Sequence, residues 1–176
     1  RSSYFDEAEA QVKYLTDTRR VNRIGIFYQN DAYGLAVKGG LVKALRKRNL
    51  DIAGEGTYER NTEDVTAAVA ALKKANPDAV SMVGTYKAMA AFIKAMRAAG
   101  FNPQFMNVSF VGSKALAHET GLEGRGVGIS QVVPFPWNFS APVVKEYQQL
   151  FEASTFVAPP PALDLGEREV GADRQR

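Results

Sequence analysis

Short apolar runs alternate with longer amphipathic segments along most of this chain, and this alternation limits its possible folds more than any other feature. The runs expected to be strands lie at 23–28, 51–57, 79–83, 104–108 and 126–133. Segments with helical periodicity separate them, so neighbouring strands cannot pair as tight hairpins and must be joined by crossovers. The pattern predicts an α/β fold, a doubly wound parallel sheet with right-handed crossovers and helices on both faces.

The segments expected to be helices carry apolar side chains at helical spacing. Two of them show a stripe at i, i+3, i+4 and i+7, which places four side chains on one helical face. The stripes consist of Val65, Ala68, Val69 and Leu72 and of Met89, Phe92, Ile93 and Met96. Asn76-Pro77 and Gly100 are the expected stops of these helices. Further helices are expected at about 3–18, from the turn at 29–31 to about 48, at 113–118 and at about 143–151.

Composition is that of an ordinary globular domain and excludes several kinds of site. Hydrophobic residues make up 45% of the chain and charged residues 23%. Because there is no cysteine, disulfides, thiolate metal sites and a cysteine nucleophile are excluded. No run approaches the roughly 18 consecutive apolar residues of a membrane span, so we expect no membrane insertion.

Charge gives little indication of a macromolecular partner. The formal net charge is +3, and the densest basic cluster lies at the end of a predicted helix, where it complements the helix dipole. Its members are Lys43, Arg46, Lys47 and Arg48. This position favours a solvated helix end over a nucleic-acid surface, so we expect no nucleic-acid partner.

The domain expected from these patterns covers residues 1–153. After Phe151 the periodicity is lost, a triple proline stands at Pro159–Pro161, and charged residues and glycine dominate the last ten positions. We expect 154–176 to be a disordered tail. The chain starts at Arg1 rather than at a methionine, and we expect it to be a fragment of a longer protein.

The carboxyl ends of the predicted strands are the expected ligand site, because ligands of open parallel sheets bind in the crevice there. The side chains at these ends are polar and aromatic, with few acids or bases, which suits stacking and hydrogen bonding more than catalysis. The candidate ligand-binding residues are Tyr33, Tyr86, Thr85, Ser109 and Phe110. A helix that starts at Tyr86 would also attract a carboxylate through unpaired backbone amides.

Some residues at these strand ends also have a purely structural interpretation. Tyr33 could pack its ring at a helix start, and Ser109 could cap the turn that follows it. Trp137, beside Pro136 after the fifth strand, is expected to cover an edge of the core.

Two motifs fail on their context. Gly121, Gly124, Gly126 and Gly128 stand between a predicted helix and a predicted strand, whereas a phosphate-binding loop follows a strand and precedes a helix. His118 is the single histidine, which does not predict a metal site or a catalytic triad. We expect no metal, no cofactor and no catalytic residue.

Several short motifs, in this order and spacing, resemble the type I periplasmic solute-binding proteins, in particular the branched-chain amino-acid-binding branch. They are Arg1-Ser2-Ser3-Tyr4 through Glu7, 23–28 with Asp31-Ala32-Tyr33-Gly34, Asn76-Pro77-Asp78-Ala79-Val80, Gly84-Thr85-Tyr86, Ala98-Ala99-Gly100-Phe101 and Gly124-Arg125-Gly126-Val127. The resemblance covers residues 1 to about 151. It implies that the chain is most of the second lobe of a two-lobed protein that closes on its ligand by a hinge.

The resemblance also implies site residues and a function. The two second-lobe tyrosines of the family fall on Tyr33 and Tyr86, and the acid that meets a ligand ammonium group falls on Ser109, a departure that favours a carboxylate without an amine. The implied role is the solute-binding component of an ABC-type uptake system, periplasmic or tethered at the cell surface. Its partners would be a small amino acid or organic acid, branched-chain or aromatic, and the transporter's membrane subunits.

Two other functions remain open at this point. The same fold could be the ligand-sensing domain of a signalling receptor. A flavodoxin-like or nucleotide-dependent enzyme lobe is a further alternative, because a doubly wound sheet supports many chemistries. A flavin or nicotinamide absorbance spectrum of the purified protein would favour the enzyme.

Overall fold

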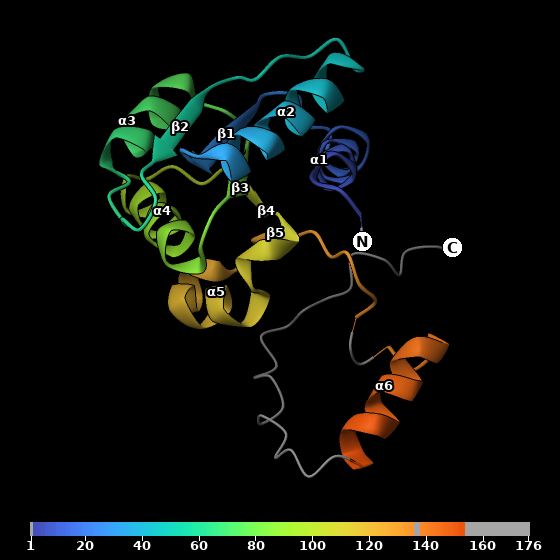
Figure 1. The fold of residues 1–176 in the computed structure, drawn as a ribbon. Coiled ribbons are helices and arrows are strands. Elements are labelled where there is room, and N and C mark those ends of the chain that lie inside the picture. Colours follow the sequence, from blue (N-terminus) through green and yellow to red (C-terminus); the bar gives the residue numbers. More distant parts are fainter. Residues whose placement is uncertain (1, 136–137, 154–176) are drawn as a thin grey trace. The chain divides into compact units, whose positions relative to one another are not determined.

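Five strands form one parallel sheet in the order β2-β1-β3-β4-β5 (Figure 1). The strands are β1 Ile24–Gln29, β2 Glu55–Tyr58, β3 Ala79–Val83, β4 Gln104–Asn107 and β5 Gly128–Ile129. The computed structural model describes residues 2–135 and 138–153. These fall into two compact units, one ending at Val133 and one starting at Pro134. The expectations for Trp137 and for 154–176 lie outside the described residues, and the domain boundary at 153 stays a prediction.

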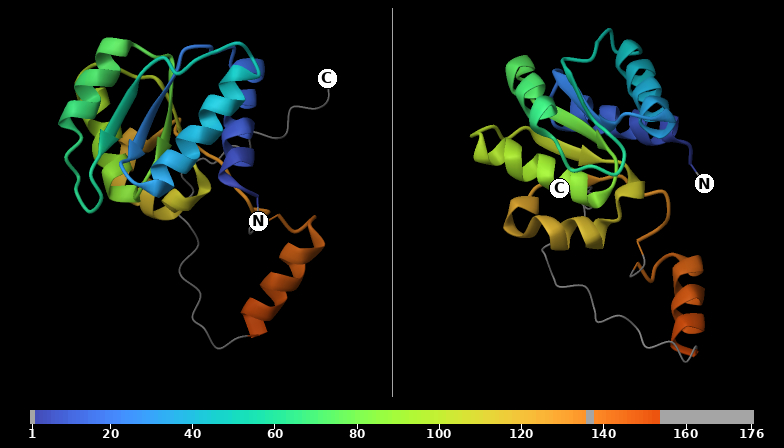
Figure 2. Two further views of the ribbon diagram at one scale, coloured as in Figure 1. Left: turned by 45° about the horizontal axis from the view of Figure 1, so that its top comes forward. Right: turned by 60° about the vertical axis from the view of Figure 1, so that its left-hand side comes forward.

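Helices cover both faces of the sheet (Figure 2). They are α1 Tyr4–Lys13, continued by a π-helical stretch at Tyr14–Thr18, α2 Ala32–Arg46, α3 Thr66–Ala75, α4 Tyr86–Ala98 and α5 Ser113–Thr120, with 3-10 turns at Ser109–Val111 and Gly121–Gly124. The helices α1 and α2 lie on one face, and α3, α4 and α5 on the other. The predicted doubly wound α/β fold is confirmed.

The core has one apolar layer on each side of the sheet. All six residues of β1 are buried, and alternate side chains enter opposite layers. Ile24, Ile26 and Tyr28 pack with α1 and α2, whereas Phe27 packs with α3 and α4. Phe27 and Phe92 stack with their ring centroids 4.0 Å apart. A central strand buried on both faces explains why the run at 23–28 shows no polar alternation in the sequence.

The helix ends follow local chemistry. The side chain of Ser3 accepts from the backbone of Asp6, whose carboxylate accepts in return from the Ser3 backbone, which is a complete capping box. Asn76 ends α3 in the left-handed conformation, and Gly100, at φ +74°, follows α4. The expected stops are therefore confirmed.

The outer strands differ most from their predicted bounds. The second strand was expected at 51–57 and lies at Glu55–Tyr58, and the fifth was expected at 126–133 but covers only Gly128–Ile129. Gly126 has φ +78°, which interrupts extended backbone before β5. Both are edge strands in this sheet order, so each has one neighbour to extend its ladder.

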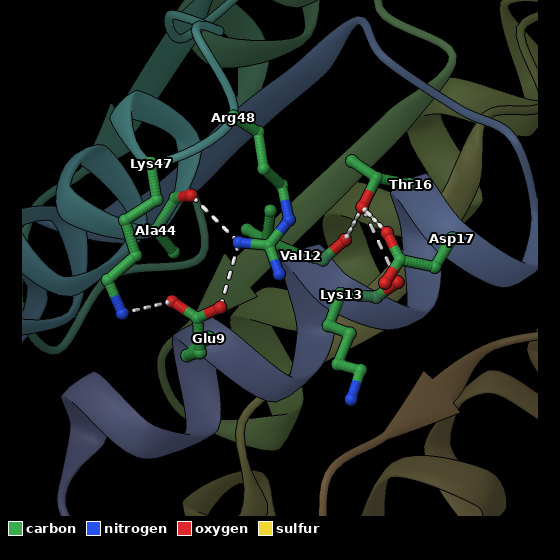
Figure 3. A network of polar contacts seen from close by, with 8 residues as sticks. All are labelled: Glu9, Val12, Lys13, Thr16, Asp17, Ala44, Lys47 and Arg48. Carbon is green, nitrogen blue, oxygen red and sulfur yellow. Dashed lines mark hydrogen bonds and ion pairs between the residues drawn. The ribbon is translucent and has the colours of Figure 1, made fainter.

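The helices α1 and α2 are joined by ion pairs at the end of α2 (Figure 3). The Glu9 carboxylate lies 2.9 Å from Lys47 Nζ and 2.8 Å from Arg48 Nη1, and Arg48 also donates to the Ala44 carbonyl. Lys43 lies over the ring of Phe5. Much of the basic cluster is thus engaged within the protein.

The second unit contains α6, Pro142–Ala153. Val143, Tyr147 and Leu150 are exposed, whereas Val144 is buried. The rings of Tyr147 and Phe151 stack 5.9 Å apart. None of the helices in the described parts of the chain is both long and apolar enough to cross a lipid bilayer.

Candidate functional site

A pocket of about 480 Å³ lies at the carboxyl edge of the sheet. Its lining comes from the start of α1, the end of β1, the start of α2, the loop after β2, the residue before α4 and the turn after β4. The lining residues are Tyr4, Gln29, Asp31, Tyr33, Arg60, Asn61, Thr85 and Phe110. The volume suits a small organic molecule. A smaller cavity of about 130 Å³ lies between α1 and α2, beside the Glu9–Lys47 ion pair and away from the strand ends.

Three aromatic rings from three elements form one wall of this pocket. The ring centroids of Tyr4 and Tyr33 are 5.2 Å apart, and those of Tyr33 and Phe110 are 5.3 Å apart in an edge-on arrangement. Phe110 is 57% exposed although it is a large apolar side chain. This wall offers an apolar surface for stacking.

The Tyr33 hydroxyl is the unusual polar group of the wall. Its oxygen is buried and has no hydrogen-bond partner within the described part of the chain. Burial raises the pKa of Tyr33, and the ionisable groups of Tyr4, Tyr58, Glu7 and Asp31 act in the same direction. The hydroxyl therefore keeps its proton and is a hydrogen-bond donor without a partner in the described part of the chain.

A chain of hydrogen bonds joins the starts of α2 and α4. Asp31 caps α2 by accepting from the Gly34 backbone at 3.0 Å, and its other oxygen accepts from the Gln29 amide. Gln29 Oε1 accepts from the Tyr58 hydroxyl at 3.1 Å, and that hydroxyl accepts from the Thr85 backbone N–H at 3.1 Å. The Thr85 N–H at the start of α4 is thus already hydrogen-bonded within the protein. It is therefore not one of the unpaired backbone amides that were expected to attract a carboxylate there.

The charge balance at Asp31 follows from these bonds. Burial alone would raise the pKa of its carboxyl, but hydrogen bonds from Gly34 and Gln29 outweigh that effect, and the pKa lies below its ordinary value. Asp31 is therefore ionised at neutral pH, in the lining of a pocket that Arg60 also lines.

A second hydrogen-bond system connects α1 to the ends of β4 and β5. The Glu7 carboxylate is buried and accepts from the Ser109 backbone N–H at 2.8 Å, from the Ser109 hydroxyl at 3.0 Å and from the Ser130 hydroxyl at 2.7 Å. One turn further along α1, Gln11 donates to the Asn107 carbonyl at 2.8 Å and accepts from the Ser81 hydroxyl. In addition to Asp31, a buried carboxylate from α1 therefore lies at this edge of the sheet.

The structure brings some of the predicted residues together and separates others. Tyr33, Thr85 and Phe110 line the pocket. Ser109 is not among the lining residues, and its hydroxyl donates a hydrogen bond to Glu7. Tyr86 is also not among them and is half-buried against the core layer that contains α3 and α4. Ligand contact by any of these five residues stays a prediction.

Sequence reasoning missed residues that the tertiary structure places at the site. The carboxyl end of the second strand was not considered as part of the site. Tyr58 stands at that end, and Arg60 and Asn61 come directly after it in the chain. Glu7 was not named among the candidate site residues. Its spacing of four from Gln11, beside the buried Ala8 and Val12, was the available signal of a polar pair on the buried face of α1.

The described residues, 2–135 and 138–153, contain no group of three or more His, Asp or Glu side chains that could hold a metal ion. The pocket lining is dominated by aromatic, amide and hydroxyl groups with one acid and one guanidinium. Such a set can bind a small polar molecule by stacking and directed hydrogen bonds.

The periplasmic binding protein family model matches residues 1–165 of this chain. The chain belongs to that family. The Leu/Ile/Val-binding protein of Citrobacter freundii is 27% identical over 126 residues, which is 72% of this chain and 34% of the relative. The leucine-specific-binding protein of Salmonella typhimurium is 29% identical over 115 residues, 65% of this chain and 31% of the relative. The predicted resemblance to branched-chain amino-acid-binding proteins is confirmed.

Solved structures of the family agree with the fold. A possible leucine/isoleucine/valine-binding protein from Rhodopirellula baltica matches with a TM-score of 0.83 and 35% identity, over 90% of this chain and 44% of that protein. A substrate-binding periplasmic protein from Ralstonia solanacearum matches with a TM-score of 0.76 and 31% identity, over 86% and 43%. The chain thus spans about a third of the curated relatives and less than half of these two structures.

Proposed function

We propose that this family member is the second lobe of a two-lobed, non-catalytic solute-binding protein. It would present a small amino acid or organic acid to the membrane subunits of an ABC-type uptake system, in the periplasm or tethered at the cell surface. The observation that carries the proposal is the pocket of about 480 Å³ at the carboxyl edge, with the aromatic wall of Tyr4, Tyr33 and Phe110. Relatives named as binding proteins for leucine, isoleucine and valine support it.

An amino acid would be favoured over the corresponding acid without an amine if its ammonium group reached the buried carboxylate of Glu7, which is not among the pocket-lining residues. Ser109 itself carries no charge, but Glu7 Oε2 lies 2.8 Å from its backbone nitrogen. Each carboxylate oxygen accepts about two hydrogen bonds, so Oε1, which receives one from Ser109 Oγ, retains capacity for another donor. A ligand ammonium group is the donor that would gain most from a negatively charged acceptor.

The proposed mechanism is closure of two lobes around the ligand. Ligand contacts from both lobes shift the population toward a closed form, which the membrane partner recognises. The present lobe would contribute the aromatic wall and the polar groups of Asp31, Arg60 and Thr85. With half of the contacts missing, we expect the chain alone to bind weakly or not at all, and micromolar binding by it would contradict this mechanism.

A thermal-shift screen of the two-lobed protein tests the proposal, with branched amino acids, their keto acids and aromatic carboxylates as the panel. Ligand at about a hundred times its dissociation constant adds roughly 2.7 kcal/mol of stability. The Tyr33→Ala variant, which removes the centre of the aromatic wall, should lose this response, whereas Lys145→Ala on α6 should keep it. If no compound stabilises the unaltered protein, the transport role is withdrawn first.

A further inference from the structure

Tyr58 joins two sides of the pocket without lining it. The side chain ends β2, is 2% exposed, and packs its ring 5.3 Å from that of Phe27. Its hydroxyl accepts from the Thr85 N–H and donates to Gln29 Oε1, both at 3.1 Å. Thr85 and Gln29 line the pocket, whereas Tyr58 is absent from its lining. The hydroxyl of Tyr58 can therefore affect a ligand through these two residues.

The hydrogen bonds that begin at Tyr58 continue to the other helix. Gln29 donates to the Asp31 carboxylate, which caps α2 through the Gly34 backbone at 3.0 Å. Every N–H or O–H in the series points toward the negative charge of Asp31. Hydrogen bonds aligned in this way polarise and strengthen one another. The starts of α2 and α4, which carry Tyr33 and Tyr86, are thereby joined by side chains rather than by the backbone alone.

The space around the hydroxyl shows that the arrangement is tight. A Cβ added to Gly84 would lie 2.1 Å from the Tyr58 hydroxyl oxygen and 2.7 Å from Met89 Cε. The oxygen therefore rests against the backbone that leads into α4. Burial raises the pKa of Tyr58, so the hydroxyl stays a donor to Gln29 at neutral pH.

We propose that Tyr58 is a positioning residue of the ligand pocket, and that its hydroxyl sets the start of α4 against the start of α2 through Gln29 and Asp31. The role in ligand binding depends on the function proposed above, whereas the coupling between the two helix starts does not. Loss of the hydroxyl uncouples the Thr85 side of the pocket from the aromatic wall at Tyr33.

The coupling is tested without ligand by assigned amide NMR spectra of the 176-residue chain. Tyr58→Phe keeps the ring and removes only the hydroxyl. We expect the Thr85 amide to shift because it loses its acceptor, and the Gly34 amide to shift because the Gln29 and Asp31 side chains relax. Tyr28→Phe is the matched control, since Tyr28 is also buried at the end of β1 but contacts Lys38 on the opposite face. An unmoved Gly34 amide in Tyr58→Phe overturns the coupling.

The effect on binding is tested by calorimetry of the two-lobed protein with L-leucine as the probe. We expect Tyr58→Phe to weaken binding on the order of tenfold, because misplacement of positioning groups is costly, and Tyr28→Phe to match the unaltered protein. Unchanged affinity in Tyr58→Phe overturns the positioning role even if the amides shift. If L-leucine fails to bind the unaltered protein, the choice of solute is wrong, and the Gly34 amide alone decides the coupling.

Discussion

Removal of the Tyr33 hydroxyl should affect folding and binding in opposite directions. The oxygen is buried with no partner in the described residues, while the ring lies between Tyr4 and Phe110. Tyr33→Phe keeps both ring contacts and removes the polar atom. The free energy of unfolding of the ligand-free protein should therefore stay constant or rise.

The size of this effect follows from the cost of an unsatisfied buried group, about 1–3 kcal/mol. Relief of that cost would raise Tm by about 2–4 °C per kcal/mol. If the hydroxyl donates to the ligand, the same variant should lose about 0.5–1.5 kcal/mol of binding free energy, roughly 2- to 12-fold in Kd. Urea denaturation of the ligand-free chain and calorimetry of the two-lobed protein measure the two quantities.

A clear result would refute this reasoning. If Tyr33→Phe lowers the free energy of unfolding by more than about 1 kcal/mol, the Tyr33 hydroxyl is hydrogen-bonded within the folded protein. It is then not an unpaired donor for a ligand. Tyr58→Phe serves as the contrast, because the Tyr58 hydroxyl makes two hydrogen bonds and its loss should destabilise by about 1–3 kcal/mol.

Three further predictions concern neighbouring groups. Glu7→Gln keeps an amide oxygen for the Ser109 N–H and the Ser130 hydroxyl, and its NH2 group can donate to Ser109 Oγ once that one hydroxyl turns, so the fold should persist. The preference for leucine over its keto acid should fall by about 1.5–3 kcal/mol in calorimetry, and an unchanged ratio would exclude the charge role. The pKa of Asp31 is lower in the folded protein than in the unfolded chain, where it is near 3.8. The ionised carboxylate therefore stabilises the fold above pH 3.8, and this stabilisation is lost as the pH falls through the folded pKa. In Asp31→Asn, which keeps a capping side chain, the urea midpoint should therefore fall less between pH 5 and pH 3 than in the unaltered protein. An equal fall in both proteins would contradict this prediction. Gly84→Ala should lower the free energy of unfolding by about 1–3 kcal/mol, because the added methyl group overpacks against Tyr58. If chemical denaturation gives the same free energy as for the unaltered protein, the structure accommodates the methyl group without strain.

Local sequence determined the order and type of nearly all elements. The i, i+3, i+4 and i+7 stripe from Met89 to Met96 became the buried face of α4, and the apolar run at 79–83 became β3 with the predicted bounds. These signals are reliable because helix and strand periodicities place side chains on a face independently of distant contacts. The edge strands were predicted less well, since Gly126 and the pairing of β5 with a single neighbour shortened a run that looked longer in the sequence.

The contents of the site depended on tertiary structure. The strand-end rule located the crevice and named Tyr33, Thr85 and Phe110 among its lining residues, because parallel strands end at one edge whatever their side chains are. It could not show that Glu7 meets Ser109 across 102 positions of the chain, or that Tyr58 meets Thr85 across 27. Such pairs arise from the packing of α1 and of β2 against the rest of the fold. Sequence periodicity therefore determined where a ligand could bind, and only the tertiary structure decided which charges and hydroxyl groups surround it, because hydrogen bonds between distant residues leave no local pattern.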